Sequence, residues 1–181
     1  MDLLEKIKIL NNHLSAKNFK KVIDGSKILL NKIPHNDYLL NLTGMAYQGL
    51  SQHQNSIKFF NQALTVAPNN IAAMNNLANS YKATGKLEDA KDLYEKILKM
   101  NPNYVNAYNN YANLKTLIND YKGAIELYLK AYDLIKNNKN IPRTSVAGIL
   151  FSLAVAYQSD NKIDETKNTV NKILSIDPSH V

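Results

Sequence analysis

Cysteine and tryptophan are absent from this chain of 181 residues, and glycine and proline are scarce, at six and five residues. The lack of cysteine excludes disulfides, thiol nucleophiles and thiolate metal ligands together. No apolar run approaches the roughly 20 residues of a membrane-spanning helix, and the first residues form no charged-then-apolar leader. The composition therefore predicts a cytoplasmic protein without a membrane segment.

The sequence also lacks a recognisable catalytic or cofactor-binding pattern. Its four histidines are scattered, with no carboxylate pair or second histidine at metal-ligand spacing. Its six glycines form no phosphate-binding loop. We therefore predict a protein that is not an enzyme and that binds no cofactor and no metal.

Prolines mark a repeat, because Pro34, Pro68 and Pro102 are each 34 residues from the next and each follows a helix-like segment. A fixed period of this length indicates an array of repeated structural units. We place each proline at place 32 of a unit and anchor a fifth unit on Pro178. This gives repeats at 3–36, 37–70, 71–104, 105–138 and 147–180, with an insertion at 139–146.

Each unit contains two apolar stripes with helical spacing, at places 4, 7, 8 and 11 and at places 20, 24 and 27. The proline prevents the second helix from continuing. Small residues recur at place 8, as in Gly44, Ala78 and Ala112, where two backbones approach. One helix pair cannot bury both stripes, so the pattern predicts an all-α solenoid that forms a single domain over residues 1–181.

These units resemble the tetratricopeptide repeat, a helix–turn–helix of 34 residues. The second unit carries the repeat's residues as Leu40, Thr43, Gly44, Tyr47, Phe60, Ala63 and Pro68. The third carries them as Met74, Leu77, Ala78, Tyr81, Ala90, Tyr94, Ile97 and Pro102. The resemblance implies a right-handed α-solenoid of about five repeats that binds a protein or peptide partner.

Asparagine gathers on the first-helix face that the core stripe does not use. Places 2, 5, 6 and 9 lie roughly opposite that stripe, at about 100° per residue. In the third and fourth units seven of these eight places hold asparagine, although composition alone predicts about one. We call these seven residues the asparagine ladder: Asn75, Asn76, Asn79, Asn106, Asn109, Asn110 and Asn113.

The ladder predicts a groove that holds an extended peptide backbone. Asparagine is a poor helix former, but its amide offers both a donor and an acceptor, as a peptide unit does. The ladder is similar to the tetratricopeptide superhelix of O-linked N-acetylglucosamine transferase, and this resemblance implies that Asn76 and Asn110 are backbone clamps. The expected peptide-binding residues outside the ladder are Asn41, Tyr38, Leu42, Met45, Phe151 and Val155. The alternative interpretation is a polar groove lining without a ligand.

Positive charge is concentrated at the start of the chain. The net charge is +7, of which +4 lies in residues 1–36. No arginine cluster or groove-reading module accompanies these lysines, so we expect no nucleic-acid partner.

The last helix leaves an apolar face at Val170, Ile173 and Leu174 without a capping helix, which favours self-association or a longer protein.

Two functions are therefore compatible with the sequence. The first is a non-catalytic module that binds an extended peptide segment in a concave groove. The second is the substrate-recruiting or oligomerising arm of a larger glycosyl-, sulfo- or methyltransferase, with its catalytic domain beyond Val181.

Overall fold

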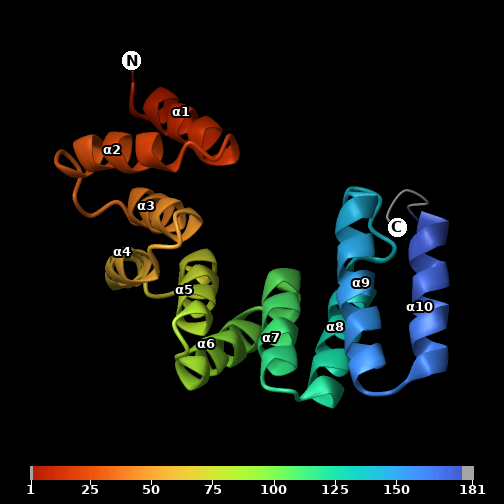
Figure 1. Ribbon diagram of the computed structural model, residues 1–181. Helices are drawn as coiled ribbons and strands as arrows, with labels where there is room; N and C mark the ends of the chain where they lie inside the picture. Colours follow the sequence, from red (N-terminus) through yellow and green to blue (C-terminus); the bar gives the residue numbers. More distant parts are fainter. Residues whose placement is uncertain (1, 177–181) are drawn as a thin grey trace. The chain divides into compact units, whose positions relative to one another are not determined.

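The computed structural model describes residues 2–176, and the regular secondary structure of these residues is entirely helical (Figure 1). Short turns join the helices, which are numbered α1 to α10 in chain order. The chain divides into two compact units, residues 1–93 and residues 94–181, and each is described by itself. The boundary falls inside α6 (Leu87–Met100). The prediction of an all-α fold is confirmed.

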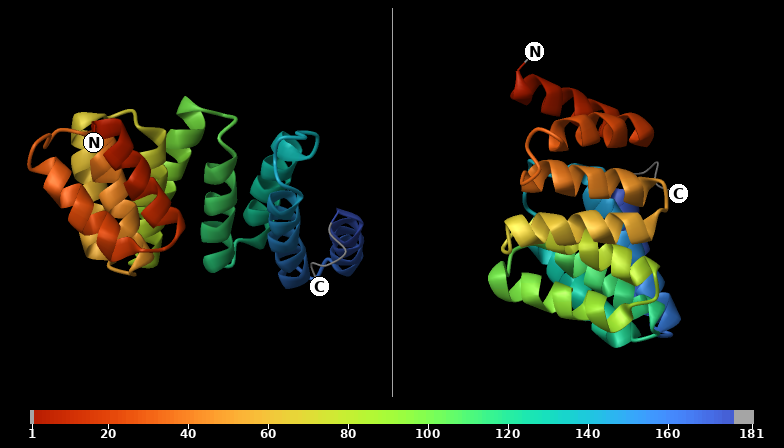
Figure 2. Two further views of the ribbon diagram at one scale, coloured as in Figure 1. Left: turned by 90° about the horizontal axis from the view of Figure 1, so that it is seen from above. Right: turned by 90° about the vertical axis from the view of Figure 1, so that its left-hand side faces the viewer.

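The first unit contains α1 (Leu3–Ser15), α2 (Phe19–Leu30), α3 (Asp37–Gly49), α4 (His53–Val66) and α5 (Ile71–Ala83). The second unit contains α7 (Val105–Leu117), α8 (Tyr121–Ile135), α9 (Arg143–Ser159) and α10 (Ile163–Ile176). In the first unit, α1 to α5 stack in chain order, each against the next (Figure 2).

The helix boundaries follow the 34-residue period. Helices α3, α5 and α7 begin at the first residues of the second, third and fourth units. Helix α9 begins one turn before Ala147, where the fifth unit was expected to start, and is 17 residues long, whereas α3, α5 and α7 have 13 each. Pro178, the anchor of the fifth unit, lies outside the described residues.

Asparagine side chains cap the starts of two first helices. The Oδ1 atom of Asn36 accepts a hydrogen bond from the backbone N–H of Leu39 at 2.9 Å, and Oδ1 of Asn70 accepts one from Ala73 at 3.0 Å. Each cap satisfies one of the backbone donors that a helix start leaves without an intrahelical partner. The Asn70 amide also donates to Asp37 Oδ2 at 2.9 Å, which ties the start of α5 to the start of α3.

Small residues allow close packing in the first unit's core. A Cβ atom at Gly44 of α3 would meet the Phe60 ring of α4 at 2.5 Å, and Phe60 is fully buried. Val22 and Leu39 are fully buried in a neighbouring cluster formed by α1, α2 and α3. The predicted contact at the small place-8 residue is thus present at Gly44.

The second unit has one continuous core that draws on all four of its helices. Fully or almost fully buried members include Ala112 of α7, Tyr128 of α8, Leu150 of α9 and Ile173 of α10. This core holds α7, which carries four of the ladder asparagines, against α8 and α9.

Candidate functional site

The ladder asparagines belong to both units. Asn75, Asn76 and Asn79 lie on α5 in the first unit, and the other four lie on α7 in the second. Each group has its own surroundings.

In the first unit, asparagine amides link α3 to α5. The Nδ2 atom of Asn76 donates to Oδ1 of Asn41 at 3.1 Å, and Nδ2 of Asn41 approaches Sδ of Met45 at 3.7 Å. Beside this pair, Nε2 of Gln48 donates to the backbone oxygen of Asn76 at 3.2 Å and to Oγ of Ser80 at 3.0 Å. These polar contacts fix the register of the two first helices.

Burial of the place-5 residues departs from the helical-wheel expectation. Asn41 is 9% exposed and Asn75 is 6% exposed, whereas Asn76 and Asn79 are half-buried. A helical wheel treats the side opposite the core stripe as open to solvent. The contact of α3 with α5 covers part of that side, so Asn41 serves packing between first helices.

In the second unit, Asn113 holds a buried tyrosine. Its Oδ1 atom accepts a hydrogen bond of 2.6 Å from the Tyr128 hydroxyl of α8. Tyr128 is 2% exposed, and burial raises the pKa of its hydroxyl because the phenolate would be poorly solvated. The hydroxyl therefore stays protonated and remains a donor to Asn113 at neutral pH.

Asn106 and Asn109 have a different environment, because both line a hollow of about 300 Å³. Asn106 is exposed and Asn109 is half-buried. The rest of the lining comes from four apolar residues and one serine: Val105, Ile135, Ile141, Ile149 and Ser145. The hollow combines two amides with an apolar wall, and Ile141 of that wall comes from the predicted insertion. Asn110, the remaining ladder residue of α7, is half-buried.

The residues expected at the apolar ends of the groove divide into two classes. Tyr38 is 45% exposed and donates its hydroxyl to Oδ1 of Asn11 at 2.8 Å, and Phe151 is 55% exposed on α9. Leu42 is only 3% exposed and packs in the core with Leu10 and Val22. Its expected place in the groove is therefore wrong, because the α3 side that carries it is covered by α1 and α2.

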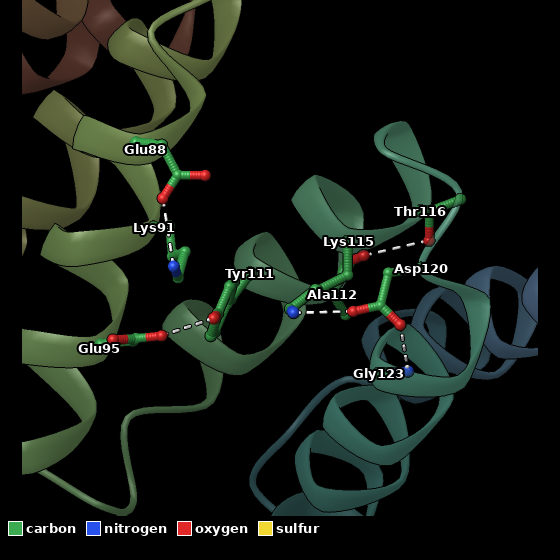
Figure 3. A network of polar contacts seen from close by, with 9 residues as sticks. All are labelled: Glu88, Lys91, Glu95, Tyr111, Ala112, Lys115, Thr116, Asp120 and Gly123. Atoms are coloured by element: carbon green, nitrogen blue, oxygen red, sulfur yellow. Dashed lines mark hydrogen bonds and ion pairs between the residues drawn. The ribbon is translucent and has the colours of Figure 1, made fainter.

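Polar contacts around α7 hold the helix that carries Asn106 and Asn109 (Figure 3). The Tyr111 hydroxyl donates to Oε1 of Glu95 at 2.8 Å, and the Tyr111 ring stacks on Tyr94 with centroids 5.8 Å apart. Near the C-terminal end of α7, Nζ of Lys115 lies 2.7 Å from Oδ2 of Asp120. This hydrogen bond, followed by one from the Gly123 N–H, holds the pKa of the Asp120 carboxyl below its ordinary value.

The predicted bare face of the last helix is smaller than expected. Ile173 is 4% exposed and belongs to the second unit's core, and Leu174 is half-buried. Val170 remains 40% exposed, and Ile163 at the start of α10 is 65% exposed. The face was overestimated because the helix phase turns Ile173 toward α9.

The described residues contain no group of three or more histidine, aspartate or glutamate side chains positioned to hold a metal ion. Among the helices of residues 2–176, none combines the length and apolar character needed to cross a bilayer.

Comparison with solved structures identifies the fold. BtubC (BKLC) from P. vanneervenii has a TM-score of 0.84 at 17% identity, covering 96% of this chain and 79% of that one. TTC0263, a thermophilic TPR protein in Thermus thermophilus, has a TM-score of 0.80 at 15% identity, with 98% and 92% covered. The structure of MamA 41-end from Desulfovibrio magneticus RS-1 has a TM-score of 0.78 at 15% identity, with 97% and 94% covered. At these identities the likeness shows the fold alone.

Family models match the central part of the sequence. One tetratricopeptide-repeat model matches residues 38–103, and a second matches residues 93–126. No curated protein matches the chain. Residues 38–126 therefore match models of the tetratricopeptide repeat, and the chain shares the all-α repeat architecture of a TPR protein.

Proposed function

We propose that this chain is a non-catalytic interaction module that binds an extended peptide segment of a protein partner along α7 and α9. Tetratricopeptide repeats generally mediate binding to protein partners, and they do so through extended surfaces built by successive repeats. The observation that carries the proposal is the hollow beside Asn106 and Asn109.

The chemistry of this hollow suits a peptide. An asparagine amide can donate to a peptide carbonyl and accept from a peptide N–H, whatever the peptide's side chains. The wall formed by Ile135, Ile141 and Ile149 can accept one apolar side chain of the same peptide. Backbone contacts from the amides and one apolar anchor would therefore act together.

Asn41 and the ladder residues then have separate roles. Asn113 and Asn41 are engaged with Tyr128 and Asn76, so we assign them to packing within the chain. Asn76 uses Nδ2 in its contact with Asn41, and its amide oxygen remains the atom suited to accept a peptide N–H. The backbone-clamp role of Asn76 and Asn110, and the similarity of the whole ladder to that of O-linked N-acetylglucosamine transferase, stay hypotheses.

The expected affinity is modest. Four to six backbone hydrogen bonds, at a net contribution of about 0.5–1.5 kcal/mol each, must offset the ordering of the peptide and its lost translational freedom. We expect dissociation constants in the micromolar range or weaker, with multivalency needed for tighter binding.

The test is a peptide selected on the full chain from a random display library and then measured by calorimetry. We expect Asn106→Ala/Asn109→Ala to weaken binding about tenfold or more. The matched control is Asn168→Ala/Asn171→Ala, because these two asparagines are exposed on α10 with the same spacing. Equal affinity for the wild-type chain and Asn106→Ala/Asn109→Ala, with native circular dichroism, would place the binding site elsewhere.

Two further assignments remain proposals. The chain as the recruiting arm of a larger transferase would be supported by a natural reading frame that continues past Val181 into a catalytic domain. Weak self-association through α10 is supported by the exposed residues Ile163 and Val170. A cytoplasmic location also stays a prediction.

A further inference from the structure

We propose that a groove between α1 and α2 docks an acidic, amphipathic helix of a partner protein, at a site separate from the asparagines. The groove consists of two neighbouring hollows of about 210 Å³ and 200 Å³ that share Lys6, Leu29 and Lys32 as lining. Within its own unit, α1 packs against α2, as Figure 2 shows, and also contacts α3.

The walls of the groove are apolar, and part of their surface is exposed. Ile9, Leu10, Ile28 and Leu29 line the larger hollow, and Leu3 and Ile33 line the smaller one. Ile28 is 63% exposed and Leu3 is 42% exposed. An apolar surface that stays exposed beside a hollow marks a site of association with another apolar surface.

The length of the groove fits about two turns of helix. Its α1 wall runs from Leu3 to Leu10, and its second wall runs from Gly25 on α2 to Ile33, which follows the end of α2 at Leu30. At 1.5 Å of rise per residue, the α1 wall is roughly 10 Å long. Two hollows along this length match apolar side chains spaced i, i+3 or i+4, and i+7 on one helix face.

Hydrogen-bonding chemistry favours a helical occupant over an extended one. The groove lies between two helices whose backbone groups are bonded internally, and its lining is almost entirely apolar apart from two lysines. An extended peptide would bring backbone N–H and C=O groups into this surface without partners, which costs free energy. A helix satisfies those groups within itself.

Charge complementarity favours an acidic occupant. Lys6 and Lys32 flank both hollows, and no carboxylate lines either of them. None of the ion pairs within residues 2–176 involves these two lysines. Residues 1–36 carry +4, so the surrounding field also attracts negative charge. Carboxylates flanking the partner's apolar stripe would meet Lys6 and Lys32.

The same argument favours a partner over a second copy of this chain. None of the helices in the described residues has a net charge more negative than −1. A second copy would therefore bring no strongly acidic helix to the lysine-flanked groove.

The test uses a display library of helix-forming peptides with leucine fixed at i, i+3 and i+7 and all other positions random, selected on the full chain. We expect the selected peptides to be enriched in aspartate and glutamate and to gain helical circular dichroism on binding. Ile28→Ser and Lys6→Gln/Lys32→Gln should each weaken a selected peptide about tenfold. The matched control is Ile118→Ser, because Ile118 is 46% exposed in the other unit and should leave binding unchanged.

The inference would be overturned if the library gave no enriched peptides, or if the enriched peptides had no excess of aspartate and glutamate. It would also be overturned if a selected peptide bound the Ile28→Ser chain as tightly as the wild-type chain. A dimer seen by sedimentation and removed by Ile28→Ser would identify a second copy as the occupant, and binding to anionic vesicles removed by Ile28→Ser would identify a membrane. Asn106→Ala/Asn109→Ala should leave the acidic peptide bound, so failure of the proposed peptide site and failure of this groove are distinguishable.

Discussion

At the scale of single residues, Gly44 and Gly148 provide opposite tests of helix packing. A Cβ atom at Gly44 would meet the buried Phe60 ring at 2.5 Å, whereas a Cβ atom at Gly148 would meet nothing within 4 Å. We expect Gly44→Ala to lower the free energy of unfolding by about 1–3 kcal/mol because the ring must move in a full core. Gly148→Ala should raise it by up to about 1 kcal/mol through helix propensity. Urea unfolding measures both changes. Equal midpoints for the wild-type chain and Gly44→Ala would show that the Phe60 ring moves without cost.

The Asp120 carboxylate makes stability depend on pH. The Lys115 ammonium and the Gly123 N–H hold its pKa below the ordinary value of 3.8 in the folded chain. Its contribution is therefore fully present above that value and is lost as the pH falls through the lowered pKa of the folded state. Asp120→Asn keeps a capping oxygen but removes the charge, so we expect a loss of about 0.5 kcal/mol at neutral pH.

That loss should disappear in acid, because the protonated wild-type carboxyl no longer differs in charge from the amide. Urea midpoints of the two chains at neutral pH and at about pH 2 measure the difference. A difference that persists unchanged in acid would show that shape, and not charge, distinguishes the two side chains.

The sequence was informative about apolar residues and less so about the partners of polar ones. Burial of Ala78 and Ala112 and the close approach at Gly44 follow from their place in the repeat. The hydrogen bond from Tyr128 to Asn113 does not follow from the repeat pattern, because it depends on the distance between two helices, which the spacing of residues along one helix does not determine. The helix N-caps could have been predicted from the sequence, since Asn36 and Asn70 are 34 residues apart and directly precede predicted first helices.

At the scale of elements, one backbone conformation recurs in every helix–turn–helix. Place 15 of each unit has a positive φ, between 57° and 78°, and is occupied by Lys17, Ser51, Gly85, Asn119 and Asn161. Only glycine adopts this left-handed region without a steric cost. The turn geometry therefore follows the 34-residue period although the residue types differ.

We expect the five turns to respond to substitution according to their present residue. Ser51→Gly should raise the free energy of unfolding by about 0.5–1 kcal/mol, and Gly85→Ala should lower it by about 1 kcal/mol, because Gly85 has no side-chain neighbour that could compensate. Asn119→Gly should change it least, since asparagine tolerates this region. Thermal or urea unfolding of the three variants checks the order, and a destabilised Ser51→Gly chain would contradict it.

The fifth unit is where periodicity predicted least. The predicted insertion at 139–146 interrupts the period, so the period does not give the start of α9 at Arg143, although Pro142 and Thr144 on either side of it are residue types typical of a helix start. The resulting segment contributes Ile141 to the hollow beside Asn106 and Asn109. The most useful part of the candidate site thus arises from a departure from the repeat, which pattern analysis of the repeats alone does not describe.

At the scale of the whole molecule, the predicted single domain and the two compact units concern different properties. The prediction rests on stacking of adjacent repeats, each of which has only its neighbours as contacts. The two units are regions of dense internal contact, and their boundary lies between Leu93 and Tyr94 within one helix. Whether the chain unfolds in one transition or two therefore stays a prediction for calorimetry, where a single cooperative transition would support one domain.

Self-association through α10 should be weak, because little of the apolar face of this helix is exposed. Of the face expected from the sequence, Ile173 is buried, and the exposed apolar residues Ile163 and Val170 are seven positions apart. Two such residues provide much less than the roughly 800 Å² per partner of a stable interface. We therefore expect a monomer at micromolar concentration and a gradual rise in sedimenting mass only above about 100 µM. Ile163→Lys/Val170→Lys should abolish this rise by placing charges in the contact, whereas Ile118→Lys, an exposed apolar position outside α10, should leave it intact. A rise that survives the α10 substitutions would assign the contact to another surface, and a tight dimer at micromolar concentration would require a larger interface than these two residues can form.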